Sequence, residues 1–119
     1  MKVLLIEDHP GLAQISCSLL RDVHGHEVQH ASTGSSAISL AASFRPDLVL
    51  IDLNLPDMTG YDVAAKLRGD AANKSTVMVA LTGFGNQVDS RLAADAGIDA
   101  HFRKPMDFDL LPGIRRAAH

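Results

Sequence analysis

The sequence of 119 residues has one cysteine, no basic block and no long apolar run. Because Cys17 stands alone, an internal disulfide is excluded, which is typical of proteins in a reducing compartment. No stretch approaches the ~20 apolar residues of a membrane-spanning helix, and the run at residues 3–6 is too short for a signal peptide. A net charge of −3 without basic clusters argues against a nucleic-acid surface. We therefore expect a cytoplasmic protein that binds neither membranes nor nucleic acid.

The composition, with 46% apolar and 21% charged residues, is that of an ordinary globular domain. Its length suits one domain with a single core, so we expect residues 1–119 to form one domain. The first, third and fourth expected strands are uninterrupted apolar runs, typical of strands covered on both faces of a parallel sheet. The five strands are expected at residues 3–6, 27–31, 48–51, 77–81 and 100–103.

A helix is expected after each strand, because apolar residues recur there at helical spacing between glycine or proline breaks. We expect the fourth helix to open at Asn86 or Gln87. The fifth contains Pro112 and Gly113, so it should start late, near Asp109, or kink. Strands that alternate with helices predict an α/β fold with right-handed crossovers. The natural arrangement is a doubly wound, flavodoxin-like (βα)5 fold with a five-stranded parallel sheet in the order 2-1-3-4-5.

Four of the expected strands end at residues that can carry chemistry. These residues are Glu7 and Asp8 after the first strand, Asp52 after the third, Thr82 after the fourth and Lys104 after the fifth. Parallel strands bring their carboxyl ends to one edge of the sheet, where such folds place ligands. A single aspartate after a strand is usually only a solvated strand end, but the joint pattern predicts a functional site.

Three clustered carboxylates repel one another, and a divalent cation relieves that repulsion. Mg²⁺ prefers oxygen ligands and keeps several waters, so a few protein ligands suffice. We expect Asp8 and Asp52 to be direct ligands, with Glu7 acting through a water molecule. The backbone carbonyl of Asn54 is within plausible reach as a further ligand. A carboxylate held by Mg²⁺ can also attack phosphorus, as in aspartyl-phosphate enzymes.

Phosphoryl transfer onto Asp52 requires in-line positioning and positive charge on the equatorial oxygens more than acid–base chemistry. Lys104 supplies a point charge for one of these oxygens. The hydroxyl of Thr82, together with a nearby backbone N–H, can bind another.

The order of these residues resembles the receiver domain of two-component response regulators, with acids after the first strand, Asp52, Thr82 and then Lys104-Pro105. The resemblance covers about residues 2–116. It implies that Asp52 accepts a phosphoryl group from a histidine kinase or a histidine phosphotransfer protein, with Mg²⁺ as cofactor. It also implies slow self-catalysed hydrolysis, a cis peptide bond before Pro105, and a signalling switch rather than an enzyme with a separate substrate.

The resemblance further implies a conformational switch, because a bound phosphoryl group adds charge and acceptor oxygens. Thr82 would move toward this group and the loop at residues 83–85 would follow, changing the surface formed by the fourth helix, fifth strand and fifth helix. The family couples this motion to an aromatic residue three positions before the lysine, where this sequence has His101. Phe84 and Asn54 occupy positions that can tune hydrolysis of the phosphoryl group.

Three alternatives remain open from the sequence. A small aspartyl-phosphate phosphatase of the haloacid dehalogenase type would need a second acid where this chain has Asn54. A flavodoxin-like electron carrier would need a phosphate-binding loop after the first strand, where Glu7 and Asp8 would repel a phosphate. A receiver that works as a phosphorylation-independent docking module is compatible with His101 at the switch position.

Overall fold

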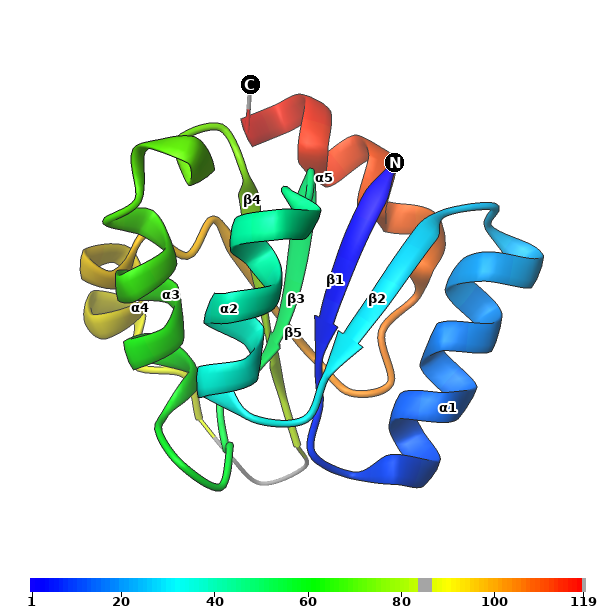
Figure 1. The fold of residues 1–119 in the computed structure, drawn as a ribbon, viewed down its shortest axis with the longest axis horizontal. Coiled ribbons are helices and arrows are strands. Elements are labelled where there is room, and N and C mark those ends of the chain that lie inside the picture. Colours follow the sequence, from blue (N-terminus) through cyan, green and yellow to red (C-terminus); the bar gives the residue numbers. More distant parts are fainter. Residues whose placement is uncertain (84–86, 119) are drawn as a thin grey trace.

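The computed structural model describes residues 1–83 and 87–118 and has one five-stranded sheet at its centre (Figure 1). All neighbouring strands are parallel, in the order β2-β1-β3-β4-β5, so the predicted fold class and strand order are confirmed. In chain order the elements are β1 Lys2–Ile6, α1 Pro10–Ser18, a π-helical turn Leu19–Val23, β2 Glu27–Ala31, α2 Gly34–Phe44, β3 Leu48–Asp52, α3 Gly60–Arg68, a 3₁₀ turn Ala71–Asn73, β4 Val77–Thr82, α4 Ser90–Ala96, β5 Ala100–Arg103, a 3₁₀ turn Phe108–Leu110 and α5 Leu111–Ala118.

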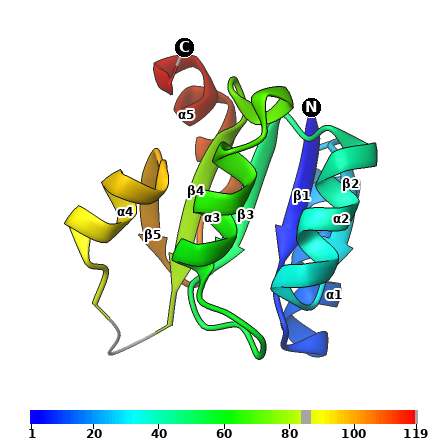
Figure 2. The same ribbon diagram turned by 60° about the vertical axis from the view of Figure 1, so that its left-hand side comes forward.

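Helices cover both faces of the sheet, with α2, α3 and α4 on one side and α1 and α5 on the other (Figures 1 and 2). Alternate strand residues therefore enter two separate cores: Leu4 and Ile6 pack on the α2–α3 side, and Val3 and Leu5 on the α1–α5 side. Every residue of β3 is buried, which explains its unbroken apolar run. None of the helices in the described ranges is long and apolar enough to span a membrane.

The fourth helix begins later than predicted. Gln87 precedes the helix, which starts at Ser90, and Asn86 lies outside the described residues. The cap is Asp89, whose carboxylate accepts hydrogen bonds from two backbone N–H groups of the first turn at 3.0 Å each. The backbone N–H of Asp89 in turn donates to the hydroxyl of Tyr61 on α3, so a tertiary contact fixes the start of α4.

The last helix starts late, as predicted from its proline and glycine. Asp107 caps a 3₁₀ turn by accepting a hydrogen bond from the N–H of Asp109, and α5 proper begins only at Leu111. Pro112 therefore lies in the first turn of α5, where its missing N–H group costs little.

Arg68 ties together the edge of the sheet at which the strands begin. Its guanidinium donates to the backbone carbonyls of Asn73, Thr76 and Gly97 at 3.0, 2.8 and 2.6 Å and pairs with Asp99 at 3.2 Å. These bonds satisfy carbonyls of two loops that have no ladder partner.

Candidate functional site

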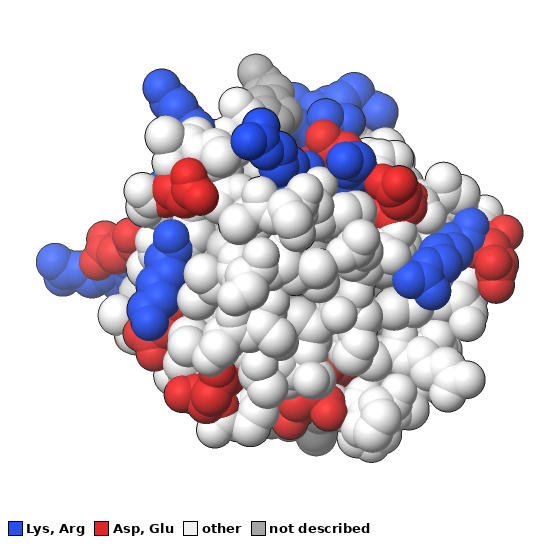
Figure 3. Space-filling model, viewed as in Figure 1, with Lys and Arg blue, Asp and Glu red and all other residues white. Residues whose placement is uncertain are grey.

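The carboxyl edge of the sheet brings the predicted acidic residues together. Glu7 directly follows β1 and Asp52 ends β3, and both are buried, whereas Asp8 is exposed. One carboxylate oxygen from each of the three lies within 4.8 Å of the other two. The charged side chains visible at this end of the molecule in Figure 3 are acidic, whereas basic side chains gather at the opposite end, near the chain termini. The local field therefore favours a cation at this edge.

Lys104 reaches into the acidic cluster from the segment after β5. Its Nζ atom lies 2.7 Å from Oε1 of Glu7 and 2.9 Å from Oδ2 of Asp52. The backbone N–H of Lys104 donates to the carbonyl of Thr82 at 2.8 Å, which holds the lysine beside the end of β4. The Lys104–Pro105 peptide bond is cis. The predicted lysine thus bridges two of the three carboxylates.

Burial and mutual hydrogen bonding divide the charge unequally between the two bridged acids. Burial raises the pKa of Glu7, and a hydrogen bond with Asp52 raises it further, while Lys104 opposes the shift. Burial also disfavours the charge of Asp52, but hydrogen bonds from Glu7, the N–H of Asn54 and Lys104 outweigh it and lower its pKa. Oε2 of Glu7 is buried without a hydrogen-bond partner in the described structure. Asp52 is thus the better anion, and Glu7 retains an acceptor that nothing satisfies.

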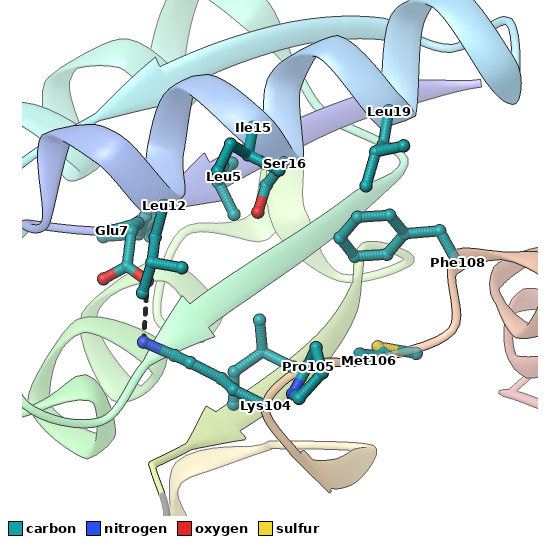
Figure 4. Close-up of a pocket in the computed structure, with 12 residues that line it drawn as sticks. Leu5, Glu7, Leu12, Ile15, Ser16, Leu19, Lys104, Pro105, Met106 and Phe108 are labelled. Carbon is teal, nitrogen blue, oxygen red and sulfur yellow. Dashed lines mark hydrogen bonds and ion pairs between the residues drawn. The ribbon is translucent and has the colours of Figure 1, made fainter.

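An apolar cavity of about 340 Å³ lies beside the cluster, between α1 and the segment that follows β5 (Figure 4). Glu7 and Lys104 close one end of it, joined by their ion pair. The remaining lining is mostly apolar, including Leu5, Leu12, Ile15, Leu19, Leu81, Met106 and Phe108. Low polarity on this side strengthens the attraction between the lysine and the acids.

The two residues predicted to act in the switch lie beyond the acidic cluster, on the β4–β5 side of the edge. Thr82 is buried, and its hydroxyl donates to the carbonyl of Phe102 on β5 at 3.5 Å. His101 on β5 is exposed. Phe84, predicted to tune hydrolysis, lies outside the described residues. In this conformation the Thr82 hydroxyl is thus engaged with β5.

The loop between β3 and α3 is folded tightly against the nucleophile candidate. The N–H of Asn54 donates to Oδ1 of Asp52 at 3.0 Å, and an antiparallel bridge joins Asn54 to Thr59. The N–H of Gly60 closes the loop by donating to the carbonyl of Leu53 at 3.0 Å. Asn54, the predicted carbonyl ligand, is thereby held next to Asp52.

Gly60 is required by close packing rather than by a special backbone angle. A Cβ atom at this position would lie 2.6 Å from the carbonyl oxygen of Asp52 and 2.8 Å from Cα of Leu53. Both neighbours are backbone, so the start of α3 or the end of β3 must move. We predict that Gly60→Ala lowers the free energy of unfolding by about 1–3 kcal/mol. Urea unfolding would measure this, and Gly69→Ala, whose Cβ would meet no atom closer than 3.5 Å, is the control.

Sequence reasoning missed two polar residues that contact this region from outside. Asp57, in the β3–α3 loop, accepts hydrogen bonds from the backbone N–H groups of Gly34 and Ser35 at 2.8 and 2.9 Å. His30, on β2, bonds the backbone carbonyl of Glu7 at 2.7 Å. No local pattern marks either residue, because each partner lies more than twenty positions away in the chain. The proline before Asp57, which makes a turn, was the only signal available.

The contacts of Asp57 predict a contribution to stability that depends on pH. The N–H groups of Gly34 and Ser35 and the Ser35 hydroxyl lower the pKa of Asp57 from 3.8 to about 2. Because the folded state lowers this pKa, the contribution is complete above about pH 4 and is lost as pH falls toward 2. Urea unfolding of the protein and of Asp57→Asn should therefore differ above this window and converge below it. A difference that is independent of pH would contradict the assignment.

Three comparisons place the chain among known proteins. Residues 3–114 match the family model described as the response regulator receiver domain. The chain is 39% identical over 116 residues to the transcriptional regulatory protein KdpE of Mycobacterium tuberculosis, a match that covers 98% of this chain and 50% of that protein. This chain thus spans about half the length of the curated relatives that it first matches.

Solved structures of two related proteins share the fold over nearly their whole length. The chemotaxis protein CheY4 of Vibrio cholerae has a TM-score of 0.85 and 25% identity, covering 99% of this chain and 98% of that one. The receiver domain of the sensor histidine kinase PA1611 from Pseudomonas aeruginosa, with a magnesium ion coordinated in its active-site cleft, has a TM-score of 0.82 and 28% identity, covering 98% and 94%. With the family model matching most of its length, the chain belongs to the response regulator receiver domains of two-component signalling.

Proposed function

We propose that this chain is a phosphorylatable signalling switch in which Asp52 accepts a phosphoryl group from a histidine kinase or a histidine phosphotransfer protein. One observation carries the proposal: the buried Asp52 carboxylate lies 2.9 Å from the Lys104 ammonium and within 4.8 Å of two further acids. We further propose that residues 1–119 form one receiver domain in the cytoplasm, and that this domain acts on no substrate other than its own phosphoryl group.

The donor set of the acidic cluster fits Mg²⁺. All three side chains offer carboxylate oxygens, which Mg²⁺ prefers, and Oε2 of Glu7 is a buried acceptor for which residues 1–83 and 87–118 supply no donor. In the proposal Asp8 and Asp52 bind the ion directly, the backbone carbonyl of Asn54 adds a third ligand, and Glu7 acts through water. When bound, the ion would neutralise the clustered charge and one phosphoryl oxygen.

The protein residues then carry the transfer. A carboxylate oxygen of Asp52 attacks the phosphorus of the phosphohistidine, the bond from phosphorus to the imidazole nitrogen breaks, and the imidazole leaves with the electron pair. Lys104 exchanges its contact with Asp52 for one with a phosphoryl oxygen. The lysine already points into the cluster, because its Nζ atom lies 2.7 Å from Glu7 and 2.9 Å from Asp52.

Signal output follows from the added charge of roughly −1.5 to −2. The Thr82 hydroxyl leaves the Phe102 carbonyl and binds a phosphoryl oxygen, which repositions the start of the loop that follows β4. The surface formed by α4, β5 and α5 changes with it, and His101 on β5 is the side chain placed to report the change. Hydrolysis by water ends the signal slowly, and Asn54 and Phe84 tune its rate.

Phosphoryl uptake from acetyl phosphate, followed by a phosphate-affinity gel over a range of Mg²⁺ concentrations, tests this function. We expect saturable uptake that disappears when the metal is chelated. If the phosphoryl group is hydrolysed too quickly to be detected, beryllofluoride is used in its place. Its binding should change the NMR spectrum of residues around Asp52. No uptake together with an unchanged beryllofluoride spectrum would contradict the proposal.

One observation supports a second candidate, a docking module that works without phosphorylation. The exposed imidazole of His101 stands where the family carries an aromatic switch residue. A module of this kind would bind its partner without being phosphorylated, and the experiment above would give no uptake.

A further inference from the structure

The corner between β2 and α2, residues 30–35, contacts both loops that carry the proposed metal ligands. One contact runs from this corner to the end of β1, next to Asp8. The other runs to the β3–α3 loop, which contains Asn54. Neither contact is part of the acidic cluster itself. We call residues 30–35 the β2–α2 corner.

The first contact replaces a hydrogen bond that the sheet cannot make. The N–H of Glu7 donates to the carbonyl of Ala31, where β2 ends. If the ladder continued, the N–H of Thr33 would donate to the carbonyl of Glu7. This N–H donates instead to the hydroxyl of Ser36 as part of the α2 capping box. The carbonyl of Glu7 accepts from Nε2 of His30 at 2.7 Å, so this nitrogen must carry a hydrogen. His30 thereby fixes the peptide unit that joins Glu7 to the next residue, Asp8.

The second contact fastens the far end of the β3–α3 loop. The loop is closed at its base by the bridge between Asn54 and Thr59, and Asp57 lies between them. Its two carboxylate oxygens accept from the N–H groups of Gly34 and Ser35, and one also accepts from the Ser35 hydroxyl at 2.7 Å. Three donors on one carboxylate at a helix start make a strong anchor. These three bonds hold the loop against the start of α2.

We infer that His30 and Asp57 are positioning residues of the metal site, which hold the loops bearing Asp8 and Asn54 at the separation that Mg²⁺ requires. The inference rests on the proposed function. Mg²⁺ demands near-ideal octahedral geometry, so mobile ligand loops lose affinity. Residues that hold metal ligands through hydrogen bonds typically change metal affinity by roughly 10- to 100-fold when replaced.

Both residues lie outside the two hydrophobic cores, so replacing them removes no core packing. A change in metal affinity can therefore be distinguished from a general loss of folding. His30 is exposed on the edge strand, and Asp57 is exposed in the β3–α3 loop. The start of α2 has a cap of its own, because the Thr33 side chain accepts from the N–H of Ser36 at 3.1 Å. Loss of either contact should therefore affect metal affinity more than stability.

The test compares His30→Leu with His30→Gln, and Asp57→Ala with Asp70→Ala. Glutamine can present an amide N–H at nearly the position of Nε2, so it keeps the donor that leucine lacks. Asp70 is the matched control for Asp57, because it is an exposed capping carboxylate at the other edge of the sheet, accepting from the N–H of Ala72 at 3.0 Å. The dissociation constant for Mg²⁺ is measured by calorimetry, and phosphoryl uptake from acetyl phosphate at limiting and saturating Mg²⁺.

We expect His30→Leu and Asp57→Ala each to weaken Mg²⁺ binding by roughly tenfold, with near-normal uptake once Mg²⁺ is saturating. His30→Gln and Asp70→Ala should bind Mg²⁺ as the unmodified protein does. Unchanged affinity in His30→Leu and Asp57→Ala would overturn the inference and leave the proposed function standing. Equal losses in His30→Leu and His30→Gln, or in Asp57→Ala and Asp70→Ala, would also overturn it. If the unmodified protein binds no Mg²⁺, the proposed function itself fails.

Discussion

Replacing Asp52 by asparagine is expected to abolish phosphoryl uptake while the fold remains intact. The amide keeps the size of the carboxylate and an oxygen that can accept from the N–H of Asn54, as Oδ1 does now at 3.0 Å. An amide does not attack phosphorus, so no acyl phosphate can form. Lys104 loses one of its two acidic partners but keeps Glu7 at 2.7 Å.

A phosphate-affinity gel and a thermal unfolding curve would measure both halves of this prediction. Asp62→Asn is the matched control, because Asp62 is an exposed acid in the first turn of α3 and its change removes the same charge. We expect normal uptake in the control. Persistent uptake in Asp52→Asn would show that another residue accepts the phosphoryl group.

Lys104→Ala is expected to reduce phosphoryl uptake by about 100- to 1000-fold, in the range seen when one donor to a developing anion is removed. Affinity for Mg²⁺ should not fall, because the ammonium competes with the metal for Glu7 and Asp52. Without the ammonium the pKa of Glu7 rises further, since Lys104 now opposes the effect of burial. The variant therefore separates metal binding from phosphoryl transfer.

Calorimetry with Mg²⁺ and uptake from acetyl phosphate at saturating Mg²⁺ are the two measurements for this variant. Lys66→Ala, on the exposed side of α3, removes the same charge and should change neither. Loss of Mg²⁺ binding in Lys104→Ala would mean that the metal lies elsewhere. Normal uptake would mean that Lys104 serves only to neutralise the acids.

The sequence was sufficient to predict the sheet because each strand signal was local. The run at residues 48–51 is apolar throughout because β3 is covered on both faces, and the polar residue that follows marks the carboxyl edge. Once parallel strands are assumed, geometry alone brings Glu7, Asp52 and Lys104 to one edge. The late start of α5 was predictable for the same reason, since the constraint on Pro112 depends only on its own helix.

What the sequence did not reveal depends on contacts between distant segments. The start of α4 is set by Asp89, whose N–H donates to Tyr61 on another helix, so the helix start predicted at Gln87 was wrong. Asp57 and His30 were missed because their partners belong to other βα units. The steric requirement at Gly60 likewise appears only when α3 is packed against the end of β3.

The most direct test of the account is to locate the phosphoryl group on the chain. The protein is incubated with acetyl phosphate, with and without Mg²⁺, then treated with borohydride, which reduces an aspartyl phosphate to homoserine, and the peptides are analysed by mass spectrometry. We predict homoserine at position 52 in the sample with Mg²⁺ and an intact aspartate in the sample without it. Homoserine at another aspartate, or at position 52 regardless of Mg²⁺, would contradict the account.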